Sequence, residues 1–149
     1  MTFTLVRSQT QAITAQRTEF AVTGKTSGQS KLEHGLMTGE TPEDVSGIAI
    51  VTTSFTLDGS NEAGEPLFTV KVDHQAIFRT EKKLQDKDAA NADIMAPMMH
   101  AATGMVHAIV HQTVVALGVA MIPPYPQFKA TFERDNDART KDFRISVDS

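Results

Sequence analysis

Residues 91–118, NADIMAPMMHAATGMVHAIVHQTVVALG, decide the fold of this chain. Asn91 is available as a helix-capping residue, and Asp93 is the better N-cap candidate. Pro97 falls in the first turn of the predicted helix, where its missing N–H costs nothing. We therefore expect a helix over Ile94–Leu117, which at about 1.5 Å per residue spans about 36 Å.

The predicted helix ends before Gly118, a residue that suits the left-handed conformation after a helix. No Asp, Glu, Lys or Arg occurs between Asp93 and Lys129. A helix that is apolar all round is buried on more than one side. One face can cover a sheet, but a monomer would leave the other face as a large exposed apolar patch.

We therefore expect the helix to pack against its counterpart in a second subunit. Small residues such as Ala101 and Ala102 would let two such helices approach closely. The predicted oligomer interface consists of His100, Gly104, Met105, His107, Ala108 and His111.

Histidines 100, 107 and 111 form one stripe of this helix. The interpretation we favour is that they are polar spacers within a helix–helix interface. His107 and His111 could share a metal ion, but no Glu or Cys accompanies them on the helix, so we expect no metal. A pH-sensitive interface is a third interpretation. A membrane span is disfavoured because these histidines and Gln112 would be costly inside a bilayer.

The residues before the helix have the composition of β-strands in a half-exposed sheet. Met1–Val22 is predicted to form one or two strands and Lys31–Thr38 a short one. Ile48–Leu57 and Leu67–Arg79 are longer, and the Gly-rich turn 58–66 joins them as an antiparallel hairpin. In the last strand one face is apolar and the other is polar or charged. The apolar face consists of Phe68, Val70, Val72, Ala76 and Phe78.

Two further segments follow the helix. Met121–Phe128 contains three prolines, which prevent a helix and favour an extended arm with apolar side chains. Residues 129–149 form a mixed-charge tail that could hold a short strand or helix or be mobile. We therefore divide the chain into a domain over residues 1–128 and a tail over residues 129–149.

Composition excludes several classes of function. The chain has 149 residues and suits one domain. The absence of cysteine rules out disulfides and thiol catalysis and fits a reducing cytoplasm. A net charge of −4, a pI of about 5.7 and the absence of tryptophan argue against nucleic-acid binding. The N-terminal residues lack the unbroken apolar core of a secretory signal.

Catalysis finds no support in the sequence. The carboxylates of Glu40, Glu43 and Asp44 lie in a polar connector, and no G-x-S-x-G nucleophile elbow occurs. We therefore expect a protein that is not an enzyme and that needs no cofactor.

The order of these elements resembles the SecB family of protein-export chaperones over Val6–Phe128. The matching motifs are Lys31-Leu32-Glu33 before a strand, the Val/Thr-rich strand Gly47–Leu57, Phe68-Thr69-Val70-Lys71-Val72, Gln75-Ala76-Ile77-Phe78, Asn91-Ala92-Asp93-Ile94 with Pro97, and the Pro-rich crossover Gly118–Phe128. The resemblance implies an α+β fold, in which a four-stranded antiparallel sheet is packed by one long helix. It also implies assembly through the helix as a homotetramer, a dimer of dimers.

Members of this family hold client chains unfolded in the cytoplasm, without nucleotide, in hydrophobic grooves between sheet and helices. Relatives with this fold occur beside toxin–antitoxin pairs and in phages. The family's export motor docks on an acidic sheet surface, and Lys71 stands here at a matching strand position. This departure argues against coupling to an export motor and favours a specialised, phage-encoded or other member.

Candidate client contacts follow from these expectations. Met121, Ile122, Tyr125 and Phe128 lie on the extended arm, which can line a groove beside the sheet. Phe55 and Phe68 are core residues by default, and the resemblance makes Phe68 a candidate groove wall. Our predicted client-binding set is Phe55, Phe68, Met121, Ile122, Tyr125 and Phe128.

The leading hypothesis is an ATP-independent, holdase-type chaperone for unfolded or partly folded polypeptides. The alternative is an oligomeric adaptor or inhibitory protein that reuses the same fold to bind one specific folded partner. A small enzyme is a third hypothesis, and it requires a deep polar pocket that the sequence does not locate.

Overall fold

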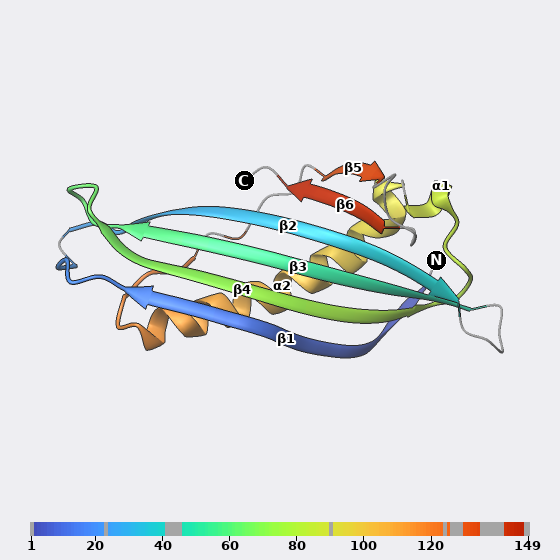
Figure 1. Ribbon diagram of the computed structural model, residues 1–149, viewed down its shortest axis with the longest axis horizontal. Coiled ribbons are helices and arrows are strands. Elements are labelled where there is room, and N and C mark those ends of the chain that lie inside the picture. Colours follow the sequence, from blue (N-terminus) through green and yellow to red (C-terminus); the bar gives the residue numbers. More distant parts are fainter. Residues whose placement is uncertain are drawn as a thin grey trace.

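A computed structural model describes residues 2–22, 24–40, 46–89, 91–123, 125, 130–134 and 142–147. The elements are β1 (Phe3–Arg17), β2 (Ser27–Glu40), β3 (Gly47–Ser60), β4 (Pro66–Thr80), α1 (Asp86–Ala89), α2 (Ala92–Ala116), β5 (Ala130–Arg134) and β6 (Asp142–Val147). The strands form one antiparallel sheet in the order β1-β4-β3-β2-β6-β5. Helix α2 runs diagonally across one face of this sheet (Figure 1).

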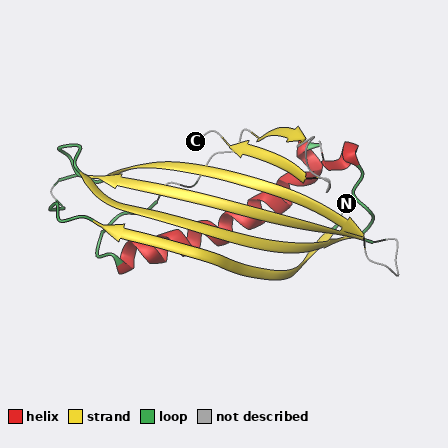
Figure 2. Ribbon diagram, viewed as in Figure 1, coloured by secondary structure: helices red, strands yellow, loops and turns green. Residues whose placement is uncertain are grey.

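The predicted four-stranded antiparallel sheet covered by one long helix is confirmed. Strands β1 to β4 are long and α2 lies on one side of them, while the described residues place no helix on the other side (Figure 2). The last two strands, β5 and β6, extend the sheet beyond β2. The sequence left open whether this part of the tail is a strand, a helix or mobile, and the structure places strands there.

All four main strands differ from the predicted bounds, and β3 runs to Ser60, three residues into the predicted turn 58–66. Of the one or two strands allowed over Met1–Val22, the structure forms one, β1, with bulges at Val6 and Gln11. β2 begins at Ser27 and continues to Glu40, so it is longer than the predicted Lys31–Thr38. Its additional residues are polar or glycine, and pairing along the whole of β3 holds them extended.

The alternation predicted for β4 is confirmed, because every second residue from Phe68 to Phe78 is buried beneath α2. β3 alternates in the same way. Directly opposite Phe68 on β3 is Gly59, and the phenyl ring occupies the space where a side chain at position 59 would lie. The large core side chains of the sheet are Leu32, Leu36, Phe55, Leu57, Leu67, Phe68 and Phe78.

The start of α2 differs from the sequence-based expectation. The N-cap is Asn91, whose side-chain oxygen accepts a hydrogen bond from the Asp93 backbone N–H at 3.0 Å. The choice of Asp93 as N-cap was therefore wrong, and Asp93 instead lies in the first turn, where its charge favours the helix dipole. Because the helix begins at Ala92, Pro97 lies inside it rather than in its first turn. Pro97 is exposed, so its ring faces away from the sheet.

The end of α2 is as predicted. Gly118 has a φ of 77°, which is the left-handed conformation that favours glycine. The Val119 N–H bonds the Val114 carbonyl and the Gly118 N–H bonds the Val115 carbonyl, the two hydrogen bonds of a Schellman motif. None of the helices in the described ranges combines the length and the apolar character needed to cross a membrane.

No basic residue occurs in the last turn of α2, and β1 supplies one instead. The Arg17 guanidinium donates a 2.6 Å hydrogen bond to the Leu117 carbonyl, and a side chain at Gly118 would collide with it. We expect Arg17→Met to lower the free energy of unfolding by about 0.5–1 kcal/mol, since a cation near a helix C-terminus contributes that much. Urea unfolding measures this change. Arg17→Lys, which keeps the charge, should recover part of it, and equal stability of Arg17→Met and wild type would contradict it.

Candidate functional site

The residues that follow α2 turn back along the helix and cover part of its outer side. Nε2 of His107 donates to the Pro123 carbonyl oxygen at 2.8 Å. Further along, the Tyr125 hydroxyl donates to the backbone oxygen of His100 at 3.3 Å, and its ring lies 5.1 Å from that of His107. The chain therefore provides, for this part of α2, some of the cover that the sequence analysis assigned to a second subunit.

The six predicted interface residues do not form one free surface. His100 and Ala108 are exposed, and Gly104 and His111 are half-buried. Met105 faces β1, where the Ser8 hydroxyl donates to its sulfur at 3.3 Å, and His107 is engaged by the crossover. The six predicted interface residues therefore include some that face outward and some that contact other parts of the same chain.

The predicted client-binding residues fall into three groups. Phe55 and Phe68 are 0% and 1% exposed, so both belong to the core and present no surface to a client in this structure. Met121 is half-buried, with its methyl group directly over Gly28.

The remaining arm residues are the accessible ones. Ile122 is 80% exposed and Tyr125 is 46% exposed. Phe128 lies outside the described residues. Burial alternates along this segment, since Val119 and Pro123 are buried and Met121 is half-buried, while Ala120 and Ile122 are exposed.

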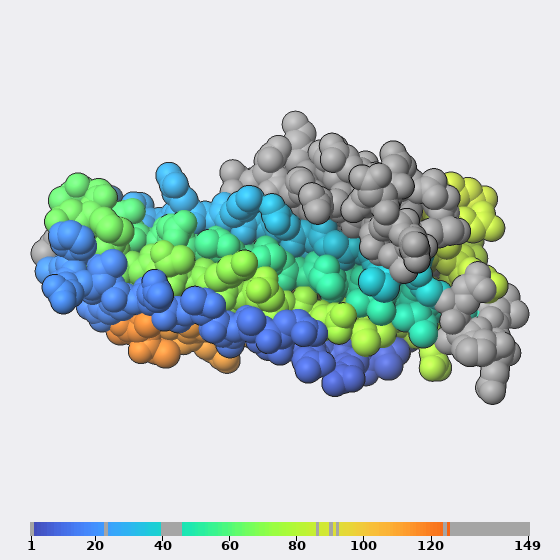
Figure 3. Space-filling view, viewed as in Figure 1, coloured from blue at the N-terminus to red at the C-terminus, as the bar shows by residue number. Residues whose placement is uncertain are grey.

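Strand β1 adds exposed apolar surface that the sequence analysis did not single out. β1 is an edge strand, and within the described ranges no strand pairs with its outer side. Leu5, Val6 and Ile13 on β1 are 43%, 57% and 50% exposed. The C-terminal end of α2 and the residues after it emerge beyond β1 in the space-filling view (Figure 3). The exposed large apolar residues are Leu5, Val6, Ile13, Phe20, Val22, Met37, Val115, Ile122 and Tyr125.

Two buried histidines on the sheet were also missed. His34 is fully buried under α2, with Nδ1 2.8 Å from the Thr53 hydroxyl and Nε2 3.0 Å from the Thr103 hydroxyl. Thr103 donates its own hydroxyl proton to the Met99 carbonyl, so it accepts from His34 Nε2–H. Nε2 of His34 therefore carries a proton. Burial lowers the pKa of His34 to about 4, which makes the ring neutral at pH 7.

His74 is the second buried histidine and is 2% exposed. Its Nε2 lies 2.8 Å from the hydroxyl of Ser8, which in turn donates to the sulfur of Met105. Nδ1 of His74 is buried and has no hydrogen-bond partner among the described residues. Burial lowers the pKa of His74 as well. The burial of His74 could have been predicted from the sequence, because His74 falls between Val72 and Ala76 on the apolar face of β4.

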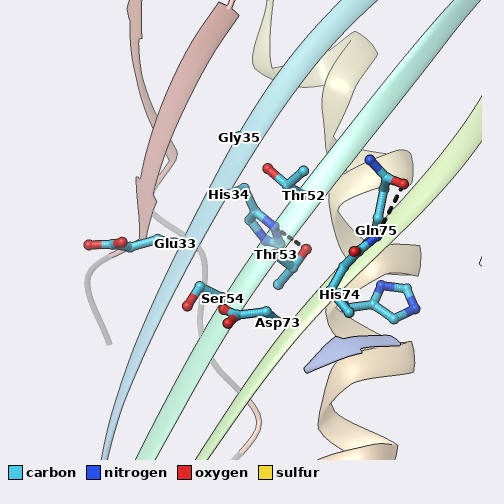
Figure 4. Close-up of a pocket in the computed structure, with 10 residues that line it drawn as sticks. Glu33, His34, Gly35, Thr52, Thr53, Ser54, Asp73, His74 and Gln75 are labelled. Carbon is cyan, nitrogen blue, oxygen red and sulfur yellow. Dashed lines mark hydrogen bonds between the residues drawn. The ribbon is translucent and has the colours of Figure 1, made fainter. Parts of the chain in front are cut away.

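The opposite face of the sheet holds a shallow polar hollow of about 500 Å³. Gly35 contributes no side chain to it, while Glu33 and Asp73 contribute carboxylates (Figure 4). The other lining residues with outward side chains are Gln11, Thr52, Ser54 and Gln75. Glu33 also pairs with Lys31 at 3.1 Å on this exposed face. No group of three or more metal-binding side chains occurs among the described residues.

Comparison with known proteins identifies the fold. No protein-family model matches the sequence, and no curated protein sequence matches it. Among solved structures, the chain is similar to the Mycobacterium tuberculosis SecB-like chaperone Rv1957, solved in complex with a ChAD peptide from the HigA1 antitoxin Rv1956. The TM-score is 0.51 at 13% identity, over 87% of this chain and 91% of that chain. The chain therefore has a SecB-like fold, as the order of its motifs indicated.

Proposed function

We propose that this protein is an ATP-independent holdase-type chaperone that binds unfolded or partly folded polypeptides through exposed apolar surface. The observation that carries the proposal is the crossover after α2, which holds Ile122 with 80% of its side chain exposed next to the covered helix. Soluble proteins avoid contiguous apolar surface unless a partner covers it. A SecB-like neighbour that was solved with a bound peptide supports the same reading.

Apolar burial would supply the driving force for this binding. Each Å² of apolar surface removed from water contributes about 25 cal/mol before the cost of ordering the client. Such contacts require no particular client sequence, and they need neither nucleotide nor metal.

We also propose that the protein assembles as a homotetramer, a dimer of dimers, in the cytoplasm. β1 is a long edge strand, and a second copy of β1 could pair with its outer side. Leu5, Val6 and Ile13 on this strand are exposed and could be covered by such a pairing. Ala108 of α2 is exposed and could take part in a helix contact. Light scattering measures the mass directly, and a monomeric mass in dilute buffer would contradict this part of the proposal.

The chaperone proposal is tested by the aggregation of reduced insulin, followed by light scattering. Stoichiometric wild-type protein should suppress the aggregation. Ile122→Asp should raise the amount of protein needed by about fivefold to tenfold, because losing one exposed apolar contact costs roughly 1–1.4 kcal/mol.

Ile122→Leu is the matched control, since it keeps the apolar area at the same position. Both variants should unfold at the wild-type urea concentration, because the side chain is mostly exposed. Absence of suppression by the wild-type protein would contradict the proposed function. Equal suppression by Ile122→Asp would remove the crossover from the client surface.

A second candidate function is an adaptor or inhibitor for one specific partner. The structural neighbour favours it, because that chaperone was solved with a peptide from one antitoxin. This alternative predicts that a pull-down recovers one folded partner at constant stoichiometry. It also predicts no effect on the aggregation of unrelated unfolded chains.

A further inference from the structure

The C-terminal strand β6 occupies an edge of the sheet that would otherwise be open. It pairs antiparallel with β2 over Leu32–Met37, less than half of that strand. β6 and its hairpin partner β5 lie beside β2 towards one end of the sheet (Figure 1). The main four-stranded sheet is thus extended by a short segment from the end of the chain.

The register of this pairing matches the core side of β2. Leu32, His34 and Leu36 are buried beneath α2, and the residues opposite them are Val147, Ile145 and Phe143. Cross-strand partners share one face of a sheet. An extended segment with apolar residues at alternate positions therefore suits the edge of β2.

The other face of the same edge carries the Glu33 carboxylate, which pairs with Lys31 at 3.1 Å, and the exposed side chain of Met37. Arg144 pairs with Gly35, the residue that leaves the hollow open, and Ser146 pairs with Glu33. Figure 4 shows the carboxylates of Glu33 and Asp73 at this hollow, on the side of the sheet away from α2. A basic residue opposite Gly35 would therefore lie one position from Glu33 and could compete with Lys31 for its carboxylate.

We infer that the β2 edge between Leu32 and Met37 binds an extended client segment by strand addition, and that β6 occupies this edge as an internal competitor. The preferred segment runs antiparallel to β2 and has the pattern apolar–basic–apolar–polar–apolar of residues 143–147. This inference rests on the proposed function. It places client binding at the β2 edge and makes β6 the element that regulates it. Backbone hydrogen bonds supply affinity in such a mode, while alternate side chains supply selectivity.

Internal competition has a measurable consequence. A client reaches the edge only in the fraction of molecules in which β6 has detached, so the apparent Kd equals the intrinsic Kd divided by that fraction. A covalent cross-link that holds β6 on β2 should therefore weaken client binding. Breaking the cross-link should restore the binding.

A disulfide provides that lock, because the natural chain has no cysteine to interfere. Met37 and Asp142 are direct partners across β2 and β6, and paired Cα atoms in an antiparallel sheet are close enough for a disulfide. The experiment uses the full chain carrying Met37→Cys and Asp142→Cys. The probe is a fluorescein-labelled synthetic peptide that contains DFRISV, and fluorescence anisotropy measures its binding.

The oxidised protein should bind the peptide at least about tenfold more weakly than the same protein after reduction, as expected when the open fraction becomes small. A peptide with glutamate in place of the arginine should bind the reduced protein more weakly. The matched control carries Thr56→Cys and Lys71→Cys, which pair β3 with β4 on the outer face, and its oxidation should leave binding unchanged.

The outcomes separate this inference from the proposed function. Equal affinity of the oxidised and reduced forms would overturn the inference, even while the reduced protein suppresses insulin aggregation. Failure of the Met37→Cys and Asp142→Cys pair to form a disulfide would contradict the β2–β6 register itself. If the protein does not suppress insulin aggregation but its peptide affinity still changes reversibly with oxidation, the holdase proposal is contradicted. The strand-addition site is then retained.

Discussion

Phe68→Ala is expected to lower the free energy of unfolding by about 3–5 kcal/mol, the usual cost of truncating a buried phenylalanine. Phe68 is 1% exposed, and its ring lies against Gly59 on the neighbouring strand. Because glycine has no side chain to fill the space, removing the ring leaves a cavity between the sheet and α2. Urea unfolding measures the loss.

Phe68→Leu is the matched control, and it should cost clearly less because most of the volume is kept. The pair of variants also separates a core role from a direct client contact. If Phe68→Ala kept wild-type stability and lost suppression of insulin aggregation, the ring would have to reach the client. The burial of the ring leads us to expect the opposite, loss of stability with suppression retained in the molecules that remain folded.

The parts of the fold that could be predicted from sequence are those in which local signals and burial agree. β4 alternates because one face lies under α2 and the other faces water, so its composition records its environment. The end of α2 could be predicted because Gly118 adopts a conformation that few other residues tolerate.

Other features depend on contacts between distant parts of the chain. Asn91 and Asp93 are both good N-cap residues, and the choice between them depends on where the chain leaves α1. His34 lies in the polar-looking segment KLEHG, and its burial follows from pairing with β3 and from the position of α2. The strands β5 and β6 are mixed in charge, and they are strands because β2 offers them an edge.

The candidate site divides in the same way. Composition indicated an apolar extended arm, and Ile122 and Tyr125 are exposed on it. The default expectation that Phe55 and Phe68 are core residues is confirmed, whereas the client-binding set also included them, and their burial presents no surface to a client. The strand β1 was expected, but its exposed apolar side chains were not singled out, because the Thr and Gln residues between them make the segment look like ordinary half-exposed sheet.

The free energy of unfolding is expected to fall by about 2 kcal/mol between pH 7.5 and pH 5, and His34 accounts for the change. In the folded state burial holds the pKa of His34 near 4, so the imidazole stays neutral at pH 5. In the unfolded chain an ordinary histidine pKa of about 6.5 applies, and the ring takes up a proton. The unfolded state therefore binds more protons, and acid favours it.

The stability that His34 contributes is fully present above pH 6.5 and is lost as the pH falls towards 4. His74 acts in the same direction, because burial lowers its pKa too. Working above pH 5 keeps most carboxylates ionised, which confines the measured change to the histidines. Urea unfolding at half-unit intervals from pH 7.5 to pH 5 gives the dependence.

His34→Gln separates this effect from a general loss of packing. Glutamine cannot titrate in this range, so the variant should be less stable at pH 7.5 and yet lose less stability on acidification than the wild type. Phe68→Leu is the control, because it weakens the core without removing a titrating group and should shift the whole curve downwards in parallel. A wild-type stability that stays constant down to pH 5 would mean that His34 takes up its proton in the folded state over the same pH range as in the unfolded chain. In that case the hydrogen bonds to Thr53 and Thr103 would have to be assigned differently.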